Sequence, residues 1–300
     1  MKKNKYKTPD KLNLFISITQ LVTVFLMMKL ISHTDSTLML VVYNIVFILA
    51  LQAGYFLIHE AGHRQLHSNH FINENLGRLI ASTFPTTYSF YREAHKSHHR
   101  NNRKDVELYD YVKPDESKAM KRFSHYLLLL GLQWVGQWLM SIIVFLTPQK
   151  ILDKKKTFSN DPDDQTFFDF VLKVKKNTII MEVLLCIAMF ISSYYLLELN
   201  MERILISYLA FAFFYSSQQQ IYHNRASRHI IEGTYNLRLP KPLQLVYLNS
   251  NFHLQHHRTP NVSWYYLDTL AQNETHAESF MKHYFRLFTP PPILPKEKYA

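Results

Sequence analysis

Long apolar runs alternate with strongly polar stretches along this chain of 300 residues. An α-helix needs about 20 mainly apolar residues to cross a bilayer, and runs of this length cover residues 12–32, 38–58, 178–199 and 204–222. A further apolar stretch covers residues 126–146. The pattern predicts an all-α membrane protein with four transmembrane helices and a large polar part outside the membrane.

The basic residues predict which side of the membrane each segment occupies. Lysines are numerous in the N-terminal tail and in residues 147–177, whereas the connectors 33–37 and 200–203 contain only Arg203. Cytoplasmic loops of membrane proteins are rich in Lys and Arg. We therefore expect a multi-pass protein with two helical hairpins and with both termini on the cytoplasmic side.

The stretch 126–146 does not fit a simple crossing. It lies between two regions that are both expected to be cytoplasmic, so a single crossing is excluded, and its two tryptophans are typical of membrane interfaces. We expect it to re-enter the membrane or to lie in the interface. The polar regions 59–125 and 223–300 should form a cytoplasmic cap of shorter helices, which completes a single domain over residues 1–300.

The composition narrows the chemistry. The chain has 16 histidines but one cysteine, Cys186, which lies inside an apolar run. This excludes a disulfide framework, a Cys-based zinc ribbon and a Cys-ligated iron–sulfur cluster. The net charge of +11 fits an anionic lipid surface, because many lysines flank apolar runs, and nucleic acid is not an expected partner. Histidine is the commonest metal ligand, so its surplus predicts a metal site.

Three histidine boxes follow the predicted spans. The first is H-x-x-x-H at 59–63, and the second and third are H-x-x-H-H at 95–99 and 253–257. Residues three and four apart lie on one face of a helix, so each box presents its imidazoles in one direction. Together the boxes supply eight imidazoles, twice the four ligands that one zinc ion uses. The count predicts two metal ions.

Alternatives to a redox metal centre are less consistent with this pattern. Residues 59–63 read HEAGH, which is the motif of a zinc peptidase with Glu60 as general base, but that function would leave the other two boxes unused. A metal carrier or sensor would place its ligands inside the spans, whereas these boxes lie just outside them. Imidazole ligands suit iron, copper, zinc or nickel, and a site where O₂ and a lipid chain can meet favours iron.

These residues resemble the integral-membrane fatty acid desaturase superfamily, whose relatives include carotenoid ketolases and hydroxylases. The resemblance extends from the second span to about residue 268, with the three boxes in order. It includes the stretch HHRTPNVSWYYL, with Pro260 and Trp264. It implies a non-haem di-iron centre that uses O₂ to oxidise a lipid acyl chain, with desaturation as the expected reaction and hydroxylation or ketolation as the alternative.

The resemblance also implies the ligand set. A ninth ligand, His223, is expected just after the last span, and Gln219 can hold a metal-bound water. No catalytic residue is expected beyond the metal ligands, which are His59, His63, His95, His98, His99, His223, His253, His256 and His257. The sequence contains no haem, flavin or iron–sulfur segment, so we expect a separate electron donor of the ferredoxin or cytochrome b5 type.

Other polar and aromatic residues near the boxes have open roles. The carboxylates of Glu60, Asp105 and Glu107 either accept hydrogen bonds from the metal-bound rings or are simply solvated. His67 is a candidate ligand or hydrogen-bond donor. Structural roles are expected for the remaining histidines, His33, His70, His125, His229, His276 and His283. Packing is the expected role, and a substrate tunnel the alternative, for Tyr88, Phe90, Tyr91, Phe213 and Phe214.

Overall fold

The computed structural model describes residues 6–152, 169–170, 172–272 and 277–295. These residues are mostly helical, as the sequence predicts. The only strands among them form one short parallel pair, β1 (Leu237–Arg238) and β2 (Glu278–Ser279).

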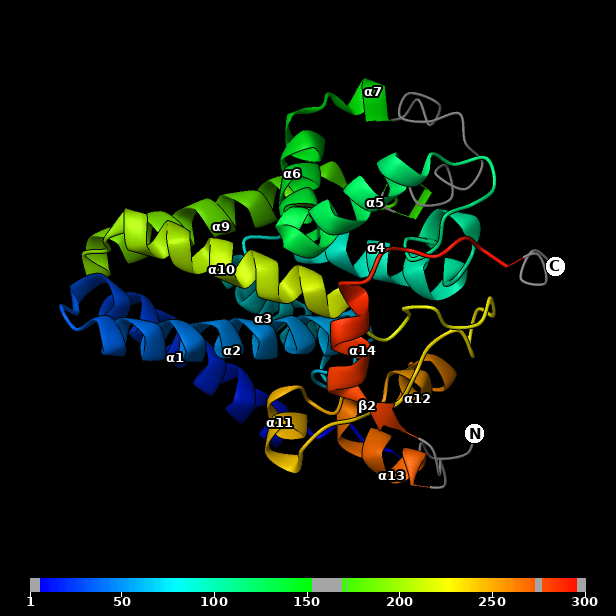
Figure 1. Ribbon diagram of the computed structural model, residues 1–300. Coiled ribbons are helices and arrows are strands. Elements are labelled where there is room, and N and C mark those ends of the chain that lie inside the picture. Colours follow the sequence, from blue (N-terminus) through cyan, green and yellow to red (C-terminus); the bar gives the residue numbers. More distant parts are fainter. Residues whose placement is uncertain (1–5, 153–168, 171, 273–276, 296–300) are drawn as a thin grey trace.

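Four long helices form the elongated part of the molecule (Figure 1). They are α1 (Asp10–His33), α2 (Thr37–Gly62), α9 (Lys176–Leu197) and α10 (Met201–Gln219). Capping side chains help to start two of them, because Ser36 accepts a hydrogen bond from the Met39 amide and Asn200 accepts one from the Arg203 amide. The caps lie in the short connectors that join α1 to α2 and α9 to α10.

The two connectors lie at the same end of the molecule, opposite the polar elements (Figure 1). The Arg203 guanidinium donates hydrogen bonds to the carbonyl oxygens of Ile31 and Thr34, at 3.1 and 2.7 Å. The His33 Nε2 atom lies 3.0 Å from the Leu197 carbonyl oxygen. These bonds satisfy carbonyl groups at helix ends and fix the two helix pairs to each other.

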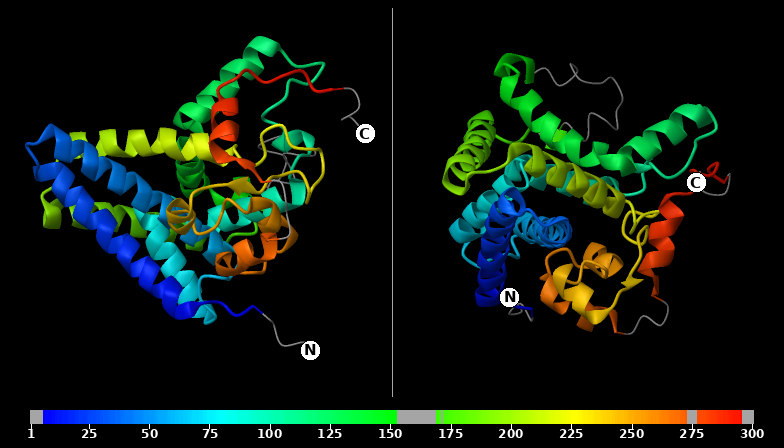
Figure 2. Two further views of the ribbon diagram at one scale, coloured as in Figure 1. Left: turned by 60° about the horizontal axis from the view of Figure 1, so that its bottom comes forward. Right: turned by 60° about the vertical axis from the view of Figure 1, so that its left-hand side comes forward.

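A bent helical stretch, Lys118–Leu146, packs against α10. It consists of α5 (Lys118–Leu127), η2 (Leu128–Leu132) and α6 (Gln133–Leu146), and the right-hand view of Figure 2 shows its two arms meeting at an angle. The bend is at Gly131, whose φ of 127° is outside the helical region. Glycine is the residue that tolerates this conformation.

Four helical stretches among the described residues are long and apolar enough to cross a membrane. Three of them, α1, α2 and α9, coincide with predicted spans. The fourth is Lys118–Leu146. The sequence predicts that residues 126–146 of this stretch re-enter the membrane or lie in the interface. The predicted span 204–222 instead forms α10, which is not among the four, because serines and glutamines fill its last turns.

The shorter elements gather at the other end of the long helices. They are α3 (His70–Thr83), α4 (Tyr88–Asn101), η1 (Asp105–Glu107), α7 (Gln149–Leu152), α11 (Lys241–Val246), α12 (His253–Arg258), η4 (Trp264–Tyr266), α13 (Leu267–Ala271) and α14 (Phe280–Leu287). Hydrogen bonds join α1 to the segment around Trp264 and to the segment that follows α2. The Trp264 indole donates to Asn13 Oδ1 at 2.9 Å, and the Asn13 amide donates to the Leu66 carbonyl oxygen.

Candidate metal centre

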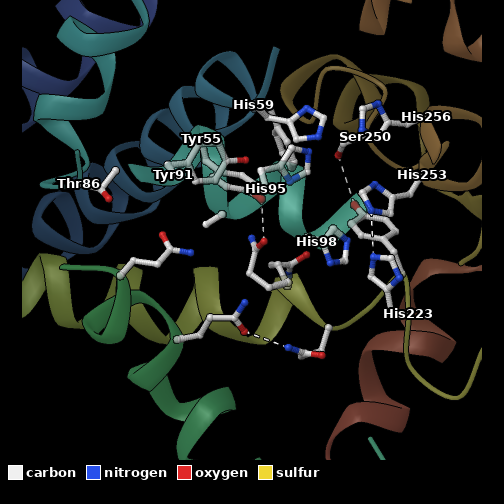
Figure 3. A pocket seen from close by; sticks show the side chains of 18 of the residues that line it. Tyr55, His59, Thr86, Tyr91, His95, His98, His223, Ser250, His253 and His256 are labelled. Atoms are coloured by element: carbon white, nitrogen blue, oxygen red, sulfur yellow. Dashed lines mark hydrogen bonds between the residues drawn. The ribbon is translucent and has the colours of Figure 1, made fainter. Parts of the chain in front are cut away.

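The three histidine boxes converge where the long helices meet the shorter elements. The first box occupies the last turn of α2, the second lies on α4, and the third forms most of α12. His223 follows α10 in a turn and joins them. The structure thus brings together all nine predicted ligands from four separate parts of the chain, and Figure 3 shows six of them around one cavity.

The nine histidines form two clusters. The first cluster contains His59, His63, His95, His99 and His256, and the second contains His98, His223, His253 and His257. In each cluster, one ring nitrogen from every member lies within 4.8 Å of the others. Two groups of imidazoles with convergent nitrogens correspond to the two ions predicted from the histidine count.

Each H-x-x-H-H box contributes to both clusters. On α4, His95 and His99 belong to the first cluster and His98 to the second. On α12, the division is reversed, with His256 in the first cluster and His253 and His257 in the second. Consecutive helical residues point about 100° apart, so one helix can serve two adjacent ions. The doubled histidine at the end of each box makes this possible.

Hydrogen bonds between the rings cannot account for the contacts in the first cluster. The Nε2 atoms of His63, His95, His99 and His256 form a row with successive distances of 2.8, 3.0 and 3.0 Å. A ring nitrogen carries either one hydrogen or one lone pair. Four such atoms in a row can therefore form at most two hydrogen bonds, so at least one of the three short contacts needs another explanation, and a cation bound between the rings supplies it.

The spacing fits metal coordination. Imidazole nitrogens about 2.1 Å from an ion lie about 3.0 Å apart when the angle at the ion is 90°, and about 3.4 Å apart in a tetrahedral site. The shortest Nε2–Nε2 distances are 2.8 Å for His63 and His95 and 3.1 Å for His223 and His253. The nitrogens of each cluster are thus close enough to bind one ion, and the five imidazoles of the first cluster exceed the four ligands that a tetrahedral zinc site uses.

Two buried nitrogens support the same conclusion. His59 Nε2 and His257 Nε2 have no hydrogen-bond partner among the described residues. A buried polar atom without a partner is unfavourable, and each of these atoms belongs to a ring in one of the two clusters. A metal ion in each cluster would satisfy both atoms.

Burial keeps these imidazoles in the form that binds metals. Removal from water lowers the pKa of each ring outside the spanning helices for which a shift is resolved, and the neighbouring histidines lower it further. The pKa values lie well below the ordinary 6.5 for His63, His95, His99, His223, His253, His256 and His257. The rings are therefore neutral near pH 7, and a neutral imidazole has a lone pair to donate.

Hydrogen bonds at the outer ring nitrogens orient two members of the second cluster. The Glu107 carboxylate lies 2.9 Å from His98 Nδ1, and the Gly233 carbonyl oxygen accepts from His223 Nδ1 at 3.2 Å. Both partners fix the tautomer in which Nε2 keeps its lone pair. Of the three candidate carboxylates, Glu107 is the one that lies within hydrogen-bonding distance of a clustered ring.

The other two carboxylates bind elsewhere. Glu60 accepts a hydrogen bond from the Trp264 backbone amide at 3.0 Å, and its other oxygen lies 3.7 Å from His59 Nδ1. Asp105 forms ion pairs with Arg228 and Lys113. Glu60 thus anchors the segment after the third box. Asp105 belongs to a group of ion pairs at the surface.

The histidines expected to be structural lie outside both clusters wherever the structure describes them. His125 Nε2 lies 2.8 Å from the Leu287 carbonyl oxygen, and His229 accepts hydrogen bonds from backbone amides. His67 also lies outside the clusters, since its Nδ1 accepts a hydrogen bond from the Asn69 amide. His276 lies outside the described residues.

The sequence model of the fatty acid desaturase family matches residues 36–290. The chain belongs to this family. The matched region contains all nine clustered histidines. Members of the superfamily are membrane di-iron oxidoreductases, which agrees with the apolar helices and with a histidine cluster able to bind metal. No curated protein matches the chain.

A cavity of about 440 Å³ lies beside the clustered histidines of this desaturase-family protein (Figure 3). Six of the nine histidines line it, namely His59, His95, His98, His223, His253 and His256. The aromatic candidates have different roles: Phe90 and Tyr91 line the cavity, whereas Tyr88 is buried and donates to the Ala61 carbonyl oxygen. Phe213 and Phe214 are not among the described lining residues.

The cavity wall also includes polar residues, all but one of which were not expected from the sequence. Gln52, Gln137 and Thr86 line it, and so do Gln133 and Gln218–Gln220. The predicted Gln219 is among these, and its Oε1 accepts a hydrogen bond from the Tyr55 hydroxyl at 2.8 Å. Gln52 and Gln137 were detectable in principle, because a polar residue inside an apolar run is costly and tends to be functional.

Proposed function

We propose that this protein is an O₂-dependent oxidoreductase that holds two non-haem irons and desaturates a lipid acyl chain. The nine convergent imidazoles carry the proposal, because two redox-active ions are their simplest use. The family assignment supports an oxidoreductase. The first cluster would hold one iron and the second cluster the other.

Bound iron supplies the O₂ activation needed to remove hydrogen from an unactivated methylene. The protein's own contribution is to position the chain. The cavity places a substrate carbon beside His59, His98 and His253 and shields it from water. Glu107 and the Gly233 carbonyl hold their histidine rings in the ligating tautomer.

Hydroxylation or ketolation of a lipid or carotenoid is the alternative outcome within the same family. Desaturation and hydroxylation share the first hydrogen abstraction and differ only in the second step of the reaction. The placement of the substrate carbon decides between them. The family match itself applies to both outcomes.

A zinc peptidase built on HEAGH is less consistent with the geometry. His59 and His63 share their cluster with three further histidines, one more ligand than a tetrahedral zinc site accepts. Glu60, the would-be base, is engaged by the Trp264 amide. This supports a role for Glu60 in anchoring the chain.

We further propose that the bent stretch Lys118–Leu146 does not cross the membrane. Near its start, His125 contacts the Leu287 carbonyl, and near its end, Val144 packs with Phe90 and Ile179 at the start of α9. Both ends of the stretch thus lie on the same side of the long helices as the two histidine clusters. In this topology the two helix pairs are the hairpins, and the histidines and both termini are cytoplasmic.

A separate electron donor, of the ferredoxin or cytochrome b5 type, would reduce the irons. Exposed cations flank the histidine boxes, with Lys96 and Arg100 on α4 and Arg258 directly after the third box. Lys96 pairs with Glu93 and Arg258 pairs with Glu232. Arg100 and the chain's net charge of +11 therefore contribute most of the positive potential here. A basic surface next to the metal site suits an acidic redox partner, because complementary charges speed association. This surface is the proposed docking site.

The test is expression of the full chain in a host with defined lipids, followed by metal analysis and mass spectrometry of total fatty acids and isoprenoids. We expect two irons per chain and a product lighter than its precursor by two hydrogens. A product heavier by one oxygen would identify a hydroxylase instead. One tightly bound zinc and no lipid product would contradict the proposal.

A further inference from the structure

The end of the cavity away from the metals contains buried polar atoms without hydrogen-bond partners. Gln52 is fully buried, and both its amide nitrogen and its amide oxygen lack a partner. The Thr86 hydroxyl and the Gln137 Oε1 atom are also unpartnered. All three side chains line the same cavity. Buried polar groups are almost always paired with protein, ordered water or a ligand, so these atoms mark a place where a bound molecule supplies the missing bonds.

Tyr55 and Tyr91 line the cavity together with these three residues. Gln52 lies two helical turns before His59 on α2, which corresponds to about 10 Å along the axis. In Figure 3, Thr86 lies beyond Tyr55 and Tyr91 when seen from the histidines. The Gln137 amide donates to the Tyr215 hydroxyl at 2.9 Å, and the Tyr215 and Tyr55 rings are 5.0 Å apart.

The free atoms define the chemistry of the missing group. Gln137 Oε1 only accepts hydrogen bonds, so the ligand must donate at least one. The Gln52 amide nitrogen only donates, so the ligand must also accept one. The carboxyl side chains that line the described wall, Glu60 and Glu107, are next to the histidines, and no Lys or Arg lines it. A neutral group that both donates and accepts fits this end of the cavity, and a hydroxyl is the smallest such group that a lipid carries.

We infer that the substrate carries a hydroxyl group on the part that lies furthest from the metals, where Gln52, Thr86 and Gln137 bind it. This inference rests on the proposed function, because it assumes that a lipid occupies this cavity. It narrows the substrate class from any acyl chain to a hydroxylated chain or ring. A chain with a plain methyl end would leave the three polar side chains unsatisfied.

The inference can be tested by direct binding to the full-length, metal-loaded protein in detergent. The probes are fatty acids of a series of chain lengths, each with a methyl, a hydroxyl or a methoxy group at the far end, in competition with a fluorescent fatty acid. At the best length we expect the hydroxyl form to bind about tenfold more tightly than the methyl form, as one net hydrogen bond gives. The methoxy group can accept a hydrogen bond but cannot donate one to Gln137 Oε1, so it should bind less tightly than the hydroxyl form.

Gln52→Leu should remove most of this preference for the hydroxyl form. The matched control is Gln20→Leu on α1. Gln20 is also buried, with 4% of its surface exposed against 0% for Gln52, and is also unpartnered, but it lines a different cavity, between α1 and α2 and the segment around α11. The control should keep the wild-type preference. Iron content and melting temperature show whether each variant is folded.

Two results would overturn the inference: equal or tighter binding of the methyl form by the wild type, or an unchanged preference in a folded Gln52→Leu protein. The binding assay does not depend on turnover. A hydroxyl preference without two irons or oxidation would contradict the proposed function alone, whereas oxidation of methyl-ended chains without a hydroxyl preference would contradict only this inference.

Discussion

Adjacent histidines in this protein belong to different clusters, and His98 illustrates the consequence. It belongs to the four-membered second cluster, whereas His99 belongs to the five-membered first cluster. We expect His98→Ala to reduce bound iron from two to about one per chain and to abolish activity, because only three ligands remain at the second ion. Metal analysis and lipid mass spectrometry measure both effects.

The control for this prediction is His70→Ala, because His70 is exposed at the start of α3 and lies outside both clusters. It should leave iron content and activity unchanged. Two irons and full activity in the His98 variant would show that this ring is not a ligand.

Glu107 should act on iron through His98, without touching the ion. Glu107→Gln weakens the charge that holds the His98 ring, and loss of such an outer partner typically lowers metal affinity about 10–100-fold. Titration with a competing chelator measures the affinity. Asp105→Asn, in the same short helix, is the matched control, because Asp105 pairs with Arg228 and Lys113. Equal iron affinity in both variants would rule out this role for Glu107.

At the residue level, the sequence predicted the clustered histidines but not their division between clusters. The spacing within a box is local, so helix geometry alone indicates that His95 and His99 share a face. Whether His256 joins them depends on how α12 packs against α4, which is tertiary information. Gln52 and Gln137 were detectable as polar residues inside apolar runs, but only the folded structure shows that they face a cavity.

Among the helices, the bend in Lys118–Leu146 depends on one residue. Gly131 has a φ of 127°, which side chains rarely adopt, and a Cβ there would lie 3.4 Å from the Ala212 Cβ. We expect Gly131→Ala to destabilise the protein by about 1–3 kcal/mol through backbone strain. A melting curve in detergent measures the loss.

Gly136 provides the comparison for this prediction. It lies in the regular helix α6, and nothing lies within 4 Å of an added Cβ. Alanine favours helices over glycine by up to about 1 kcal/mol, so Gly136→Ala should be neutral or stabilising. A melting temperature that falls equally in both variants would mean that the bend does not depend on Gly131.

The sequence predicted the positions of the long helices more reliably than their relation to the membrane. Hydropathy located α1, α2 and α9, because their apolar runs are continuous. It was less decisive for α10, whose final turns carry the polar residues Ser216, Ser217 and Gln218, of which Gln218 lines the cavity. The bend at Gly131 was not predicted, since a lone glycine in an apolar run is compatible with a straight helix.

For the whole molecule, the metal site is the point where distant parts of the chain meet. α2, α4, α12 and the turn after α10 each supply ligands. Bound iron should therefore stabilise the fold as well as the site, because ligands that bind only the native state raise its stability. Removal of iron with a chelator should lower the melting temperature.

This stabilisation should depend on pH with a defined sign. Burial lowers the pKa of the clustered rings, for example His95 and His256, below the ordinary 6.5. The unfolded chain then binds more protons than the native one as the pH falls below 6.5, so the metal-free protein loses stability towards acid and has its full stability above that pH. Protons also compete with iron for the same lone pairs.

We expect the iron-loaded protein to melt well above the metal-free protein at about pH 8, and the difference to shrink at about pH 5.5, below the ordinary histidine pKa. Comparison of the two forms at each pH separates the metal effect from general acid unfolding, and a difference that stays constant or grows towards acid would show that these imidazoles do not hold the metal.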